Sequence, residues 1–149
     1  MPIFRFRLAP VLRVRERHRE AQRLALAEVE NEQRRLLDDI YRLEQQLTAI
    51  MQDMARTPGE FLAAADLQLY GEFTQQLVRS LQLKRTLLAA VEERRDERRL
   101  ALLEADKDVK SLEQLKHRLE ARALREEAAT AQRQTDEVGQ RRHMERQRV

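Results

Sequence analysis

The stretch LAEVENEQRRLLDDIYRLEQQLTAIMQDM (residues 26–54) decides the fold, because its apolar residues recur at alternating spacings of three and four. This spacing puts them on one face of an α-helix, at the a and d positions of a coiled coil. The series has a single polar member and consists of Leu26, Val29, Gln33, Leu36, Ile40, Leu43, Leu47, Ile50 and Met54. A weaker series continues it upstream through Val11, Val14, His18 and Ala25. We predict a long helix over about residues 10–56.

A second series with the same alternation follows later in the chain and predicts a second helix, over about residues 66–140. It contains four polar members, at Lys84, Arg95, Arg98 and Lys116. The apolar members are Leu77, Leu81, Leu88, Val91, Leu102, Ala105, Val109, Leu112 and Leu119.

The segment between the two series, residues 57–66, is predicted to form the tip of a turn. It contains Pro58, which disfavours helix at the residue before it, and Gly59. Two starts for the second helix fit the residues. Thr57, Pro58 and Glu60 have the pattern of a capping box, whereas Asp66 is a second N-cap candidate.

Composition agrees with a thin helical structure. The chain of 149 residues is 37% charged and 4% aromatic, with 3 Gly and 3 Pro, which is typical of long helices and coiled coils. We therefore predict an all-α fold in which residues 1–149 form a single coiled-coil domain. Its two long helices form an antiparallel hairpin. The second helix is longer, so its C-terminal part overhangs the first and is followed by a basic tail to residue 149.

Several functional classes find no support in the sequence. The chain has no cysteine, and no stretch approaches the ~18 apolar residues of a membrane span. We expect no metal site and no cofactor, because His18, His117 and His143 are scattered and the three glycines are isolated. Catalysis needs groups that converge in a cleft, which a two-helix structure lacks, so we expect no enzymatic activity. The run EERRDERR (residues 92–99) is expected to form i,i+4 ion pairs.

Both ends of the chain are basic. Residues 1–19 carry six arginines and one acid, and residues 133–149 carry five arginines and three acids. In a hairpin both segments lie at the open end, where they can bind nucleic acid, anionic lipid or an acidic protein surface. Arginines 5, 7, 13, 15, 17 and 19 have almost no acid nearby in the sequence, so we expect their partners to lie outside the chain.

The N-terminal segment FRFRLAPVLRVRERHREAQRLALAE (residues 4–28) resembles the start of the FliJ family, small proteins of flagellar type III export. These commonly open with Phe-basic-Phe-basic-Leu followed by Val-Leu and a basic helix. LYGEFTQQL (69–77) is similar to the segment after the family's tip. SLEQLKHRLEARALREEAATAQRQTDEVGQRR (111–142) resembles its C-terminal helix.

The resemblance implies a role in bacterial flagellum biogenesis as a stalk, similar to the γ subunit of rotary ATPases. Such a stalk sits in the pore of the hexameric export ATPase, links it to the membrane export gate and escorts export chaperones. It implies a cytoplasmic protein, peripheral at the cytoplasmic face of the inner membrane and monomeric alone. The implied gate-binding residues are Tyr70, Phe73, Leu77, Ser80 and Lys84. The implied ring-binding residues are Phe4, Arg5, Phe6, Arg7, Arg13, Asp136, Glu137 and Arg141. The ring is expected to supply acidic groups and an apolar collar for Phe4 and Phe6.

Two other classes fit the residues without the resemblance. One is a generic coiled-coil scaffold or homodimer, which should associate through its apolar series. The other is a basic helical nucleic-acid binder, although the C-terminal tail lacks aromatic residues between its arginines for stacking on bases. With the stalk reading, we expect no nucleic-acid partner.

Overall fold

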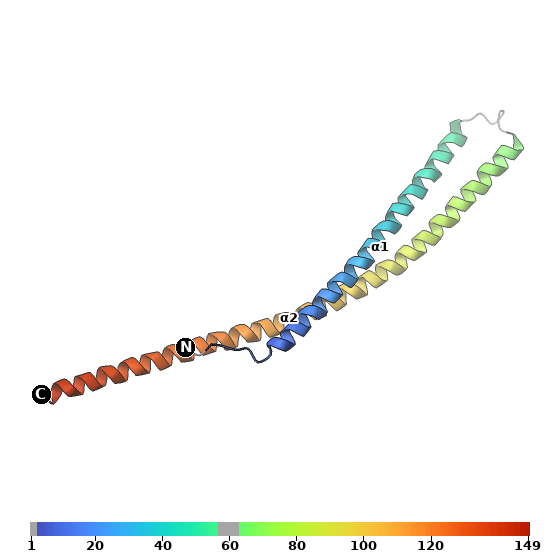
Figure 1. Cartoon of the computed structure of the whole chain (residues 1–149). Coiled ribbons are helices and arrows are strands. Elements are labelled where there is room, and N and C mark those ends of the chain that lie inside the picture. The colour runs from blue at the N-terminus through green and yellow to red at the C-terminus, as the bar shows by residue number, and fades with distance from the viewer. Residues whose placement is uncertain (1–2, 57–62) are drawn as a thin grey trace. The chain divides into compact units, whose positions relative to one another are not determined.

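A computed structural model describes residues 3–56 and 63–149 and contains two long helices (Figure 1). Helix α1 is Ala9–Arg56, of 48 residues, and helix α2 is Ala64–Gln147, of 84 residues. Within the described residues there is no strand, and no residue has a positive φ. The fold is therefore all-helical, with two long helices as a helical hairpin requires.

The start of α2 differs from the expectation for Asp66. The amide of Leu67 donates to the carbonyl of Ala63 at 3.1 Å, so Ala63 occupies the N-cap position. Asp66 lies in the first turn and is not the cap, although its carboxylate is still favourable near the positive end of the helix dipole. The alternative start at Thr57, Pro58 and Glu60 lies outside the described residues.

The other end of α2 continues to Gln147, beyond the expected end at residue 140. Gly139 lies inside the helix and has no positive φ. A glycine in a helix interior costs about 1 kcal/mol relative to alanine, which weakens a helix without ending it. The Thr135 hydroxyl donates to the Ala131 carbonyl at 2.9 Å, one helical turn earlier in the chain.

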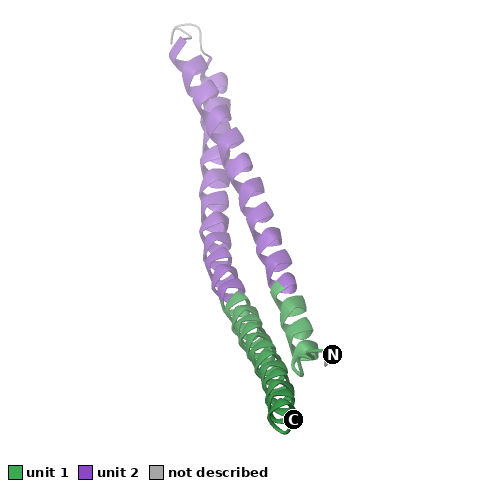
Figure 2. Cartoon of the chain, turned by 90° about the vertical axis from the view of Figure 1, so that its left-hand side faces the viewer, with its two compact units in different colours: residues 1–19, 104–149 green, residues 20–103 purple. Residues whose placement is uncertain are grey.

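The chain divides into two compact units, each containing a segment of both helices (Figure 2). One unit comprises residues 20–103. The other comprises residues 1–19 and 104–149.

In the unit of residues 20–103, the buried side chains are those of the two predicted apolar series. Val29, Leu36 and Val91 form a cluster against which Leu88 packs. Three further side chains, Ile40, Leu77 and Leu81, are also buried. The a/d register predicted for this part of the chain is confirmed.

Ion pairs between the two helices flank this apolar contact. Lys84, a polar member of the second series, pairs with Asp39 at 3.0 Å, and both side chains are partly exposed. The other pairs are Arg85–Glu44 at 2.9 Å, Arg94–Glu32 at 3.0 Å and Arg99–Glu30 at 3.7 Å. Residues 39 and 44 of α1 thus meet residues 84 and 85 of α2, while residues 30 and 32 meet 99 and 94.

The run at residues 92–99 does not form the i,i+4 pairs that we expected. Arg94 pairs with Glu32 of α1, and Arg95 pairs with its neighbour Asp96 at 3.1 Å. Arg98, expected in the apolar series, is exposed. The reason is that α1 places acids along the edge of the contact, where the arginines of α2 reach them directly.

In the second unit, Leu12, Ala105 and Val109 are buried. Three members of the expected upstream series were wrong, because Val11, Val14 and His18 are all exposed, whereas the fourth, Ala25, is half-buried in the other unit. The helix instead turns Leu12 and Arg19 inward, and these lie fourteen and seven residues before Leu26. The heptad register therefore continues unchanged, but through an arginine that the apolar pattern does not reveal.

Acidic residues of α2 pair with the arginines of α1 in this unit. Asp106 lies 3.4 Å from Arg19 and 2.8 Å from Lys110, and Asp108 lies 3.3 Å from Arg15. The expectation that Arg15 and Arg19 have partners only outside the chain is thus wrong. A hydrogen bond from Lys110, with a smaller contribution from Arg19, lowers the pKa of Asp106 despite slight desolvation.

The register predicts a large difference between two leucines two residues apart. Leu81→Ala should lower the free energy of unfolding by about 2 kcal/mol, because it removes a buried side chain from a thin core. Leu83→Ala is the matched control and should change it by less than about 0.5 kcal/mol, because Leu83 is exposed. Urea unfolding followed by circular dichroism measures both. Equal losses would contradict this register.

The lowered pKa of Asp106 predicts a pH-dependent stability. Its carboxylate stabilises the fold above its unfolded-state pKa of about 3.9, and this contribution disappears as the pH falls through the lower folded-state value. Asp106→Asn should therefore reduce the melting temperature slightly at about pH 6 and have little effect near pH 2. The control is Asp38→Asn, an exposed acid with no ion pair among the described residues. A melting-temperature difference for Asp106→Asn that stays constant with pH would refute this account.

Candidate functional site

The N-terminal segment before α1 separates its apolar and basic side chains. Residues 3–8 are not helical, and the Ala9 amide donates to the Phe6 carbonyl at 3.1 Å where the helix begins. Phe4 and Phe6 are half-buried, whereas Arg5 and Arg7 are exposed. An extended segment produces this result because successive side chains point to opposite sides.

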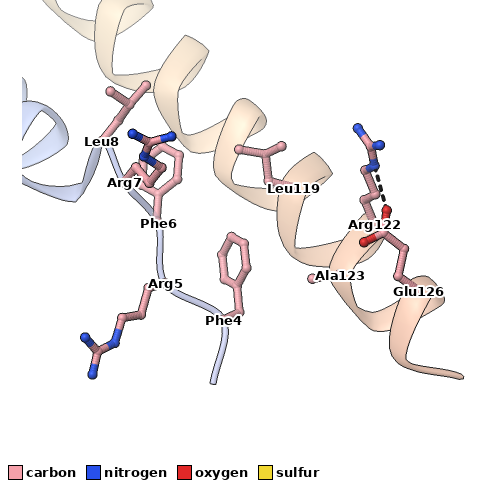
Figure 3. A pocket seen from close by; sticks show the side chains of 9 residues that line it. All are labelled: Phe4, Arg5, Phe6, Arg7, Leu8, Leu119, Arg122, Ala123 and Glu126. Carbon is pink, nitrogen blue, oxygen red and sulfur yellow. Dashed lines mark hydrogen bonds and ion pairs between the residues drawn. The ribbon is translucent and has the colours of Figure 1, made fainter. Parts of the chain in front are cut away.

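The two phenylalanines face α2 within the same unit. With Leu8 they line a groove whose opposite wall contains Leu119 and Ala123 (Figure 3). Arg122 and Glu126 stand beside it and form an i,i+4 ion pair at 3.0 Å. This chain therefore supplies one apolar surface for Phe4 and Phe6, and the collar expected of the ring stays a prediction.

The sequence did not predict this groove: Leu119 is the last member of the predicted second series, and Ala123 lies beyond it. A second hollow continues along α2 past Phe4 and is lined by Ile3, Ala123, Leu124, Thr130 and Ala131, with Glu120, Glu126 and Glu127 among its other residues. The available signal was the i,i+4 spacing of Leu119, Ala123 and Glu127, which places them on one side of the helix. Two of these three residues are too small or too polar to register as an apolar series.

Four arginines of the N-terminal region extend into solvent. Arg5, Arg7, Arg13 and Arg17 are exposed, and none forms an ion pair among the described residues. A guanidinium group donates in a planar fork that matches carboxylates and phosphates. These four groups are therefore free to bind an anionic surface.

The C-terminal part of α2 is helical and fully exposed. Every side chain from residue 128 to residue 149 is exposed. Of the residues that the resemblance implies here, Asp136 accepts a hydrogen bond from the Gln132 amide at 3.0 Å. Glu137 and Arg141 make no side-chain hydrogen bond or ion pair in the described part of the chain. Apart from the hollow that Thr130 and Ala131 share with Ile3, this segment has no face turned toward the rest of its unit.

The five residues implied for gate binding divide between two faces of α2. Leu77 is 5% exposed and lies in the apolar contact, and Lys84 is paired with Asp39. Tyr70 is half-buried on the same side. Phe73 and Ser80 are exposed on the neighbouring side. Phe73 and Ser80 are thus directly accessible to a partner, whereas Leu77 is not.

The described residues offer little for chemistry or for membrane insertion. They contain no group of three or more His, Cys, Asp or Glu side chains placed to hold a metal ion. No described helix combines the length and the apolar character needed to cross a membrane. The described residues do offer surfaces for contact with a partner. The unit of residues 1–19 and 104–149 has exposed arginines and an apolar groove, and the unit of residues 20–103 has the exposed side chains of Phe73 and Ser80 on α2.

Comparison with known proteins shows which family this chain is similar to. The family model described as the flagellar FliJ protein matches residues 4–148, which include the N-terminal segment, both helices and the exposed end of α2. No curated protein and no solved structure matches the chain. The FliJ family is a non-catalytic component of flagellar export. Because the match covers nearly the whole sequence, the chain belongs to the FliJ family.

Proposed function

We propose that this chain is the stalk of the flagellar export ATPase ring, in which it couples the ring to the membrane export gate and escorts unloaded export chaperones. It acts as a cytoplasmic protein, peripheral at the cytoplasmic face of the inner membrane, and is monomeric alone. Its partners are the ATPase hexamer, a membrane export gate protein and export chaperones, and nucleic acid is not among them. Family membership supports the export role.

The stalk needs an antiparallel coiled-coil hairpin with an overhanging C-terminal helix. The order of the ion pairs supports the antiparallel direction, because residues later in α1 pair with residues earlier in α2. The pairs Arg15–Asp108 and Arg19–Asp106 continue the same order in the other unit. Each pair joins exposed or half-exposed charges and contributes at most about 1 kcal/mol, so their role is mainly to select this register.

The observation that carries the proposal is the complete exposure of helix α2 from residue 128 onward. Most of the stability of helices in proteins comes from tertiary packing, which this segment lacks, so a partner would stabilise it. A ring with a central pore contacts a helix on all sides, which suits a segment without a buried face. The exposed arginines Arg5, Arg7 and Arg13 belong to the same unit and would add electrostatic attraction to an acidic ring.

Within this proposal the role of Phe4 and Phe6 differs from the ring contact that the resemblance implies. Because both rings line a groove with Leu119 and Ala123, they hold the N-terminal segment on α2. Arg5 and Arg7 belong to the same segment, where both border the groove and are exposed to solvent. Asp136, Glu137 and Arg141 offer charges of both signs on the exposed helix.

The competing classes make different predictions for the purified protein. A scaffold that associates through its apolar series would form dimers in sedimentation experiments. A nucleic-acid binder would bind duplex DNA with an affinity that falls steeply with salt, since each neutralised phosphate releases counterions. The proposal of a stalk requires neither behaviour.

Charge reversal at the N-terminal segment tests ring binding. Arg5→Glu with Arg7→Glu should weaken the apparent affinity for the ATPase about tenfold, because each exposed pair is worth up to ~1 kcal/mol and reversal adds repulsion. The measurement is stimulation of ATP hydrolysis by the ring as a function of stalk concentration. The effect should shrink as the ionic strength rises.

The control is Arg34→Glu with Arg56→Glu, which reverses two exposed charges in the other unit and should leave stimulation unchanged.

A second test is removal of residues 133–149, which should abolish stimulation without lowering the stability of the remainder, because these side chains are exposed. Unchanged stimulation in both altered proteins would show that this end is not the ring-binding end.

The gate-binding set is tested by separating its accessible and buried members. Phe73→Ala should weaken binding to the cytoplasmic part of the gate protein about tenfold and leave the melting temperature unchanged, since the aromatic ring is exposed. Leu77→Ala should lower the melting temperature, because its side chain is buried. The control Leu103→Ala removes a similarly exposed side chain from α2. Equal gate binding by the Phe73 and Leu103 variants would remove Phe73 from the interface.

A further inference from the structure

Helix α2 carries a second heptad series whose members are all exposed. It consists of Leu69, Phe73, Gln76, Ser80, Leu83 and Leu87, which we call the outer stripe. The spacings alternate between four and three, as in the buried series. Every member directly precedes a member of the inward face, which consists of Tyr70, Thr74, Leu77, Leu81, Lys84 and Leu88.

The contrast in exposure between the two series is complete. All members of the inward face are buried or half-buried, and all members of the outer stripe are exposed. The large apolar members Leu69, Phe73, Leu83 and Leu87 are 66, 46, 60 and 44% exposed. Scattered surface leucines are ordinary, but here two pairs of large apolar side chains, Leu69 with Phe73 and Leu83 with Leu87, lie on one face within about 27 Å along the helix.

The charges along one edge of the outer stripe are basic. Lys84 adjoins the stripe, and its ion pair with Asp39 shows which side of α1 borders it. Arg35 and Arg42 lie four residues before and three residues after Asp39, and therefore on that same side. Both are exposed, and neither forms an ion pair among the described residues.

The acids on this edge are already engaged. Asp39 pairs with Lys84, and Glu32 pairs with Arg94. On the other edge of the stripe, Glu72 and Arg79 are seven residues apart, and their opposite charges leave that edge nearly neutral. The stripe is thus an apolar line bordered by two unpaired guanidinium groups on the α1 side.

We propose that the outer stripe of α2 docks an amphipathic α-helix of another protein, with an apolar face against Leu69, Phe73, Leu83 and Leu87 and acidic residues along the edge that meets Arg35 and Arg42. A helix is the occupant because heptad spacing on one helix is complementary to the same spacing on another. Acidic residues on its edge complete the charge pairing that this chain leaves open. Gln76 and Ser80 are small or polar members at the centre, where the docked helix can approach closely.

Leu69, Leu83 and Leu87 are not among the residues implied for the gate or for the ring, and none of them lies in the unit proposed to enter the ring. Loss of helix docking and loss of ATPase stimulation are therefore separate outcomes. Phe73 and Ser80 belong to both sets, which indicates that the stripe extends the accessible part of the gate-binding surface.

The test uses a synthetic fluorescent helix of about three heptads, with leucines at the a and d positions and glutamates on both edges, and a twin with lysines on the edges. The full-length protein should bind the acidic helix in a saturable manner in fluorescence anisotropy. Leu83→Gln with Leu87→Gln should weaken binding at least about tenfold, because truncation of core interface residues commonly costs more than 1 kcal/mol each. The twin with lysines should bind several-fold more weakly than the acidic helix.

The matched control is Leu100→Gln with Leu103→Gln, which removes two exposed leucines of the same helix outside the stripe. It should leave binding unchanged. Equal loss in the stripe and control variants, equal binding of the two helices, or no saturable binding up to about 1 mM would overturn the proposal. Sedimentation of the full-length protein provides a second check. A dimer that the stripe variant dissociates would show that the occupant is a second copy of this chain, which also overturns it.

Discussion

The structure depends on the alternation of apolar residues at three and four positions, which gives each helix one narrow face to bury. In the described residues, the buried side chains are nine in number and all of them are apolar. A core of this size buries little apolar area per residue. A single substitution outside the contact between the helices therefore changes the free energy of unfolding only slightly. The remainder of each helix is consequently free to carry charges and binding surfaces, as a component of flagellar export requires.

A narrow apolar contact leaves the register poorly determined, because a helix can slide by one heptad and bury similar residues. Polar groups at the contact remove this ambiguity. Lys84 occupies a position in the apolar series and reaches Asp39, and Arg19 does the same with Asp106. A slip by one heptad would keep an acid beside only one of the two cations. In one direction Lys84 would meet Glu32 while Arg19 met Arg99, and in the other Arg19 would meet Glu113 while Lys84 met Gln46. The polar members thus contribute little energy to the folded state but raise the energy of the alternatives.

The sequence predicts those features that follow from strong periodicity. The inward face from Leu26 to Met54 is as expected, since every member is buried or half-buried. The prediction was wrong where the face is polar. Leu12 and Arg19 continue the register, but we assigned the inward positions to the neighbouring Val11 and Val14 because these are apolar. Periodicity of hydrophobic residues cannot identify a half-buried position that an arginine occupies.

Contacts between distant segments were the second kind of error. The groove between Phe4 and Phe6 and residues Leu119 and Ala123 joins parts of the chain more than a hundred residues apart. Likewise, Arg15 and Arg19 appeared to lack partners because their acids, Asp108 and Asp106, lie in the other helix. Local counting of charges finds only neighbours in sequence, whereas a two-helix contact brings each residue close to a segment far along the chain.

The set of gate-binding residues taken from the resemblance has a physical explanation in α2. Residues spaced at three and four on one helix look like a single surface in the sequence, yet they belong to two adjacent stripes here. Leu77 and Lys84 face α1, while Phe73 and Ser80 face outward. Each member of the outer stripe directly precedes a member of the inward face in the sequence, so the two stripes lie about 100° apart around the helix axis. In the proposed gate contact, a substitution at Leu77 would therefore alter partner binding only by disturbing the helix on which Phe73 stands. Phe73 is exposed and does not support the fold, so variants at the two residues would separate stability from recognition.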